Sequence, residues 1–110
     1  MNEEKIFHIL SDELFIRPAQ VKAAAELLDA GNTVPFIARY RKEATGSLED
    51  EQLRSLEERL TYLRNIAKRQ EEILSKIEEQ GKLTDALRAA IDKTTKLQDL
   101  EDLYLPYRQK

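Results

Sequence analysis

The sequence predicts an all-α domain of about five to six helices, and three observations lead to this. Hydrophobic residues make up 41% of the 110 residues but aromatic residues only 6%, so aliphatic side chains that favour helices must build the core. Apolar residues recur three and four positions apart through much of the chain, as on one helix face. No stretch alternates apolar and polar residues over a useful length, which leaves no candidate strand.

Three short helices are expected within residues 1–47. Pro18 fits the first turn of the second helix, where its missing N–H would have no partner in any case. Gly31 fits the left-handed cap that ends this helix, and Thr33 can cap the third. The expected spans are about 3–14, 18–30 and 35–44.

A long helix over about 48–80 carries the strongest pattern. Its apolar positions form a heptad repeat, with a at 53, 60, 67 and 74 and d at 56, 63, 70 and 77. Ile66 and Ile73 widen this stripe by one flanking position, which favours antiparallel packing on neighbouring helices over a two-stranded zipper. At 1.5 Å per residue the helix would be roughly 48 Å long, so part of it is expected to pack outside the first helices.

Residues 81–110 are expected to close the fold. Gly81 ends the long helix, Thr84 caps the next one, and Pro106 ends an apolar face that resumes at Leu97. The chain therefore reads as one helical domain over 1–110, and we expect it to be part of a larger multidomain protein.

Charge and composition exclude several function classes. The net charge is −3, which counts against a dedicated nucleic-acid-binding role for the domain as a whole. The absence of cysteine excludes disulfides, thiolate metal sites and a cysteine nucleophile. No basic start followed by an apolar run marks a signal peptide, and no apolar run approaches the roughly 20 residues of a membrane span. We expect a cytoplasmic protein without membrane contact.

A catalytic or metal site is not expected. The single histidine, His8, has Glu4 and Asp12 one turn away, but a lone histidine among carboxylates is far more often a surface residue. Three isolated glycines cannot form a phosphate-binding loop. We therefore predict no catalytic residue, no cofactor and no metal ion.

The segment 33–43 has an unusual density of cations, with a charge of +2 in an otherwise acidic chain. It contains Arg39, Arg41 and Lys42, and Tyr40 stands among them. These residues form a possible contact for phosphates or a protein partner, with Tyr40 as a stacking group, and Arg108 is a further possible contact.

A second interpretation of this segment is purely structural. The arginines would form ion pairs with the acidic long helix, while Phe36, Ile37 and Tyr40 pack in the core. We favour this interpretation, because the planar fork of arginine suits interfacial ion pairs as well as phosphates.

Two strings of residues together resemble the Tex family of bacterial transcription accessory proteins. They are Thr-Val-Pro-Phe-Ile-Ala-Arg-Tyr-Arg-Lys-Glu at 33–43 and Leu-Glu-Asp-Leu-Tyr-Leu-Pro-Tyr-Arg at 100–108. The stretches 53–60 and 77–83 are similar to that family too. Strings of eleven and nine residues are far more specific than a short motif.

The resemblance implies a large, cytoplasmic, multidomain protein. Its helical N-terminal region would be followed by a ribonuclease-H-like domain, helix-hairpin-helix elements and a C-terminal OB-fold domain that binds RNA. The present chain would correspond to the helical region alone, and the resemblance places no catalytic residue in it.

The expected function is therefore that of a non-enzymatic helical scaffold or interaction module of a Tex-like protein. It would position downstream domains, and possible partners are RNA or DNA and RNA polymerase. The expected packing surface consists of Phe36, Leu56, Leu63 and Ile77, and the long helix is also a candidate for self-association. The alternative function is direct binding of the phosphate backbone by segment 33–43.

Overall fold

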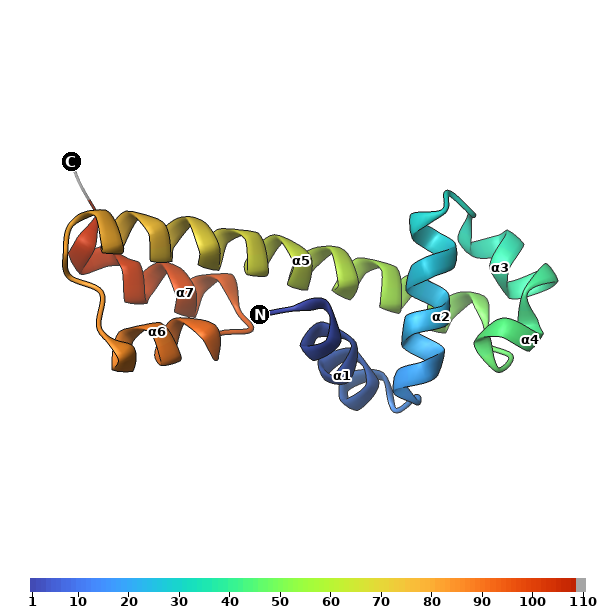
Figure 1. Cartoon of the computed structure of the whole chain (residues 1–110). Coiled ribbons are helices and arrows are strands. Elements are labelled where there is room, and N and C mark those ends of the chain that lie inside the picture. Colours follow the sequence, from blue (N-terminus) through green and yellow to red (C-terminus); the bar gives the residue numbers. More distant parts are fainter. Residues whose placement is uncertain (109–110) are drawn as a thin grey trace. The chain divides into compact units, whose positions relative to one another are not determined.

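The computed structural model describes residues 1–108, and all regular structure within them is helical (Figure 1). The elements are α1 (Glu3–Leu14), α2 (Pro18–Asp29), α3 (Val34–Tyr40), α4 (Lys42–Thr45), α5 (Asp50–Glu79), α6 (Asp85–Asp92), α7 (Leu97–Tyr104) and the 3-10 turn η1 (Leu105–Tyr107). The predicted all-α class and the long helix are confirmed. Among the described residues no helix is long and apolar enough to cross a bilayer.

The third predicted helix, 35–44, is in fact two helices. Arg41 separates α3 from α4 because its backbone, at φ −127° and ψ 34°, is not helical. Thr33 caps α3 as predicted, and its hydroxyl oxygen accepts the N–H of Phe36 at 3.3 Å. This break raises the number of α-helices in the described chain to seven, above the five to six predicted.

The contacts of the chain fall into two compact units. One comprises Asn2–Tyr62, and the other begins at Leu63 and includes Met1. We call them the N-terminal and the C-terminal unit; α5 begins in the first and ends in the second. A single domain over 1–110 stays a prediction, and its end lies outside the described residues.

The N-terminal unit has an aliphatic core, in which α2 packs on α1, α3 and α4. Its polar ties are local: the Gln20 side chain donates to the Thr45 carbonyl at 3.0 Å, and the buried Thr45 hydroxyl accepts the N–H of Leu48 at 3.3 Å. Its fully buried side chains are those of Ile6, Leu10, Val21, Ala24, Ala25, Ile37, Leu53 and Leu56.

The C-terminal unit has a polar residue at its centre. Gln70 is 1% exposed, and its amide nitrogen donates to the carbonyl oxygens of Ile91 and Thr94, at 2.9 and 3.1 Å. These bonds satisfy the backbone where α6 ends, so the buried amide ties α5 to the turn that leads into α7. Its fully buried apolar side chains are Leu63, Ile66, Ile73, Ile77, Ile91 and Leu100.

The predicted heptad is wrong at its a positions in the second half of α5, whereas its d positions, Gln70 and Ile77, are buried as predicted. Ile66 and Ile73, expected as flanking positions, are fully buried, whereas the predicted a positions Ala67 and Leu74 are only partly buried. A straight α-helix has 3.6 residues per turn and drifts by about 20° per heptad, so a strict seven-residue repeat does not stay on one face without supercoiling. The buried stripe therefore steps by three residues twice in succession at Leu60, Leu63 and Ile66.

Candidate nucleic-acid interface

The short helices α3 and α4 present a surface of cations and aromatic rings. We call it the α3–α4 face, and it consists of Phe36, Arg39, Tyr40, Arg41 and Lys42. Helix α3 is anchored by Val34 and Ile37, which are 6% and 0% exposed. Because these two positions hold one side of the helix inward, its remaining side chains turn outward, and Tyr40 is 53% exposed.

Each arginine of the α3–α4 face lies over an aromatic ring. The rings of Phe36 and Tyr40, one helical turn apart, have centroids 5.1 Å apart and are tilted by 48°. The guanidinium carbon of Arg41 lies 5.1 Å from the Phe36 centroid, and that of Arg39 lies 5.4 Å from the Tyr40 centroid. These contacts hold the cations in place without neutralising them.

The structural interpretation of segment 33–43 fails for its arginines. Within the described residues, no carboxylate forms an ion pair with Arg39, Arg41 or Lys42. Arg41 instead donates from Nη1 to the carbonyl of its neighbour Tyr40 at 3.0 Å. Ile37 is buried as this interpretation requires, but Tyr40 is 53% exposed and does not pack in the core.

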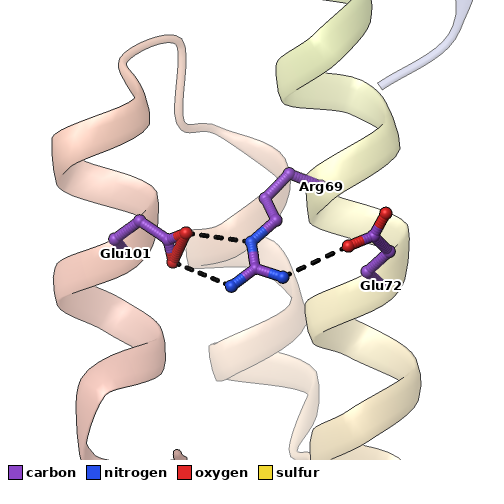
Figure 2. Close-up of polar contacts among 3 residues, drawn as sticks. All are labelled: Arg69, Glu72 and Glu101. Atoms are coloured by element: carbon purple, nitrogen blue, oxygen red, sulfur yellow. Dashed lines mark hydrogen bonds and ion pairs between the residues drawn. The ribbon is translucent and has the colours of Figure 1, made fainter.

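Arginines on α5 behave differently, and Arg69 is the clearest case (Figure 2). Its Nε and Nη2 donate to the two carboxylate oxygens of Glu101 on α7, at 2.9 and 3.2 Å, and its Nη1 donates to Glu72 at 3.2 Å. These hydrogen bonds, above all those to Glu101, raise the pKa of the Arg69 guanidinium above its ordinary value. Arg69 therefore joins α5 to α7, and its charge is already compensated.

The sequence match decides the family. Residues 4–78 match the family described as the Tex-like protein N-terminal domain. The chain belongs to this family. The matched region contains the α3–α4 face and ends one residue before the end of α5.

Relatives of this Tex-like domain are much longer than the chain. Protein YhgF of Escherichia coli (strain K12) is 57% identical over 110 residues, which are 100% of this chain and 14% of YhgF. The "Transcriptional accessory protein Tex" of Neisseria gonorrhoeae is 60% identical over 105 residues, 96% of this chain and 14% of that protein. The human "S1 RNA-binding domain-containing protein 1" is 33% identical over 100 residues, 91% of this chain and 10% of that protein.

The predicted packing residues of the Tex-like domain lie inside its own units. Leu56, Leu63 and Ile77 are each 0% exposed, so they hold α5 to its own neighbours. Phe36 is partly exposed and belongs to the α3–α4 face. Arg108 is exposed in the C-terminal unit, where it lines a hollow of about 280 Å³ together with Lys76 and Tyr104.

His8 is exposed on α1 of the Tex-like domain, as a surface residue would be. In residues 1–108, no group of three or more histidine, cysteine or carboxylate side chains is placed to hold a metal ion. The expectations of no cofactor and no metal stay predictions.

Sequence reasoning missed Phe15 as a surface feature of the Tex-like domain. This residue ends α1 in the left-handed conformation, at φ 57° and ψ 41°, and its side chain is 94% exposed. The sequence offered one indirect signal: the first helix ends before Pro18, yet residues 15–17 contain no glycine or asparagine, the residues that usually adopt a left-handed helix end.

Proposed function

We propose that this Tex-like domain is a non-catalytic interaction module whose α3–α4 face contacts the phosphate backbone of nucleic acid. One observation carries the proposal: Arg39 and Arg41 are held over aromatic rings, yet within the described chain no carboxylate compensates them. A guanidinium in this state keeps most of its N–H donors for a ligand, and its planar fork matches phosphate.

The surrounding chemistry fits such a ligand. Lys42 adds a third exposed cation beside the two arginines, and Tyr40 offers a half-exposed ring on which a base can stack. The chain as a whole carries −3, so its affinity for nucleic acid depends on local groups of cations such as this one. Binding of this kind is driven by the release of counterions and weakens steeply with salt.

The names of relatives support the setting. The Neisseria gonorrhoeae relative is called a transcriptional accessory protein, and the human relative an S1 RNA-binding domain-containing protein. We place the present chain in such a protein, in the cytoplasm, with RNA polymerase and later domains of the same polypeptide as further partners. Leu63 and Ile77 are buried within the C-terminal unit, so contacts with those domains would have to come from other residues.

Fluorescence polarisation tests the proposal, with labelled single-stranded RNA and duplex DNA at two salt concentrations. We expect salt-sensitive binding by the wild-type chain. In the Arg39→Ala/Arg41→Ala variant we expect the affinity to fall about tenfold or more. Lys68→Ala/Arg88→Ala is the matched control, because it removes the same charge from two exposed positions of the C-terminal unit. Equal losses in both variants, or no binding at low salt, would refute a site on the α3–α4 face.

A further inference from the structure

We infer that Phe15 is a docking anchor for a later segment of the longer polypeptide to which a Tex-like domain belongs. Two independent features of Phe15 disfavour phenylalanine in the isolated chain. Its ring is 94% exposed to water, and its backbone has a left-handed φ of 57°. A left-handed conformation is unfavourable by about 1–2 kcal/mol for a residue with a side chain.

The turn itself does not need the aromatic ring. It is closed by hydrogen bonds to Ser11: the backbone N–H of Phe15 and that of Ile16 both donate to the Ser11 carbonyl, and the Ser11 hydroxyl donates to the Ile16 carbonyl. Glycine would make the same backbone bonds without strain. Elsewhere the chain does use glycine in this way, since Gly46 ends α4 with φ +67° and Gly81 follows α5 with φ +69°.

The surroundings of Phe15 have the character of a small docking site. Phe15 and the partly buried Ile16 line a wide-open hollow of about 500 Å³, together with Ser11 and Gln20. Asp12 and Arg17, both exposed, also line this hollow. The hollow therefore combines apolar, polar and charged side chains, and contacts between proteins commonly have such a mixed composition.

The size of this site decides between the possible occupants. Burial of one phenylalanine removes at most about 150–250 Å² from water, whereas a stable contact between separate chains buries about 1,200–2,000 Å². A second copy of the chain is therefore a poor occupant. A segment of the same polypeptide needs far less area, because tethering gives it an effective concentration of about millimolar.

The relatives are long enough to supply such a segment outside the matched residues. The chain matches only 14% of the Escherichia coli relative, so most of such a polypeptide lies outside the matched residues. The inference rests on the proposed place of the chain in a longer protein. It does not depend on nucleic-acid binding by the α3–α4 face.

Photo-crosslinking tests the inference in a chimera in which this chain replaces the matching segment of YhgF. The crosslinker p-benzoylphenylalanine is introduced at position 15, and at exposed Glu26 as a control. We expect position 15, but not position 26, to crosslink within one polypeptide to a segment outside the 110 residues. A crosslink to a second polypeptide, a crosslink confined to residues 1–110, or none above the control would overturn the inference.

A second variant separates docking from folding. Phe15→Gly keeps the turn and removes the ring, so we expect the chimera to keep its helicity while protease cleavage within the segment that crosslinks to position 15 becomes faster. Unchanged cleavage would contradict a docking role. Nucleic-acid binding is measured separately on the 110-residue chain and its Arg39→Ala/Arg41→Ala variant, so a failure of one idea can be told from a failure of the other.

Discussion

Arginines contact aromatic rings in two regions of the chain, and the two regions differ in what else the arginines contact. On α5, Arg59 lies 4.9 Å from the ring centroid of Tyr62 and also donates to both carboxylate oxygens of Glu13, at 2.8 and 3.0 Å. Arg69 has the same two kinds of partner. On the α3–α4 face, Arg39 and Arg41 have the ring but no carboxylate within the described residues.

This difference distinguishes arginines that stabilise the fold from arginines that are available to a ligand. A ring contact alone does not distinguish a binding site, because all four arginines have one. A carboxylate that takes two N–H donors fixes the guanidinium and cancels its charge, and hydrogen bonding to Glu13 accordingly raises the pKa of Arg59. An arginine without such a partner keeps its charge for a ligand.

The largest expected effect on stability tests whether the side of α5 that contains Leu63 belongs to the core. Leu63→Asp places a charge where the side chain is 0% exposed. We therefore expect the free energy of unfolding to fall by about 4 kcal/mol or more, which leaves the chain largely unfolded. Thermal unfolding followed by circular dichroism measures it, with the exposed position Lys68→Asp as the control on the same helix. Full helicity and an unchanged Tm in Leu63→Asp would show that this face of α5 is not core.

The next effect tests the structural role of a paired arginine. Arg69→Met leaves Glu101 without its two N–H donors. We expect the free energy of unfolding to fall by about 1.5 kcal/mol, after allowance for solvent screening. Because the pKa of Arg69 is raised, its contribution is present at neutral pH and is lost only as the pH rises through its strongly alkaline folded value. Urea denaturation at pH 7 measures the loss, and wild-type stability in Arg69→Met would remove the distinction between the two regions.

A smaller effect on stability concerns Phe15, whose exposed ring has no ion pair or aromatic contact in the described chain. Phe15→Gly relieves the left-handed strain and exposes no new core, so we expect the isolated chain to gain about 0.5–1 kcal/mol. The gain should appear as a higher urea midpoint with an unchanged m value. A destabilised variant would mean that the ring contributes to the N-terminal unit.

The smallest effect belongs to the unpaired arginines themselves. Arg41→Met removes a ring contact at an exposed site, so we expect stability to change by no more than about 0.5 kcal/mol. The same urea titration used for Arg69→Met measures it. A loss as large as that of Arg69→Met would assign Arg41 to the fold and contradict a role in binding.

Local signals made much of the fold predictable. Thr33, Pro18 and Gly31 marked helix ends through capping chemistry that depends on neighbours in sequence, and the long helix followed from its apolar spacing. The break at Arg41 left no comparable signal, because neither proline nor glycine marks it. The burial of Ile66 in place of Ala67 depends on how α5 packs, which spacing alone does not determine.

The candidate site was predictable only in part. The density of cations at 33–43 identified the segment, but whether its arginines were paired depended on residues distant in sequence. The pairing of Arg69 with Glu101 spans 32 positions, so no local pattern could separate that arginine from Arg41. Only the folded chain shows which carboxylates reach which cations.

An NMR titration tests the central claim most directly. A short single-stranded RNA is added to the 15N-labelled chain at low salt, and the shift of each backbone amide is followed. We predict that the largest changes fall within residues 33–43, and that they vanish in Arg39→Ala/Arg41→Ala while the rest of the spectrum keeps its wild-type positions. Changes centred on the C-terminal unit, or changes at 33–43 that persist in the double variant, would contradict the claim that the unpaired arginines form the site.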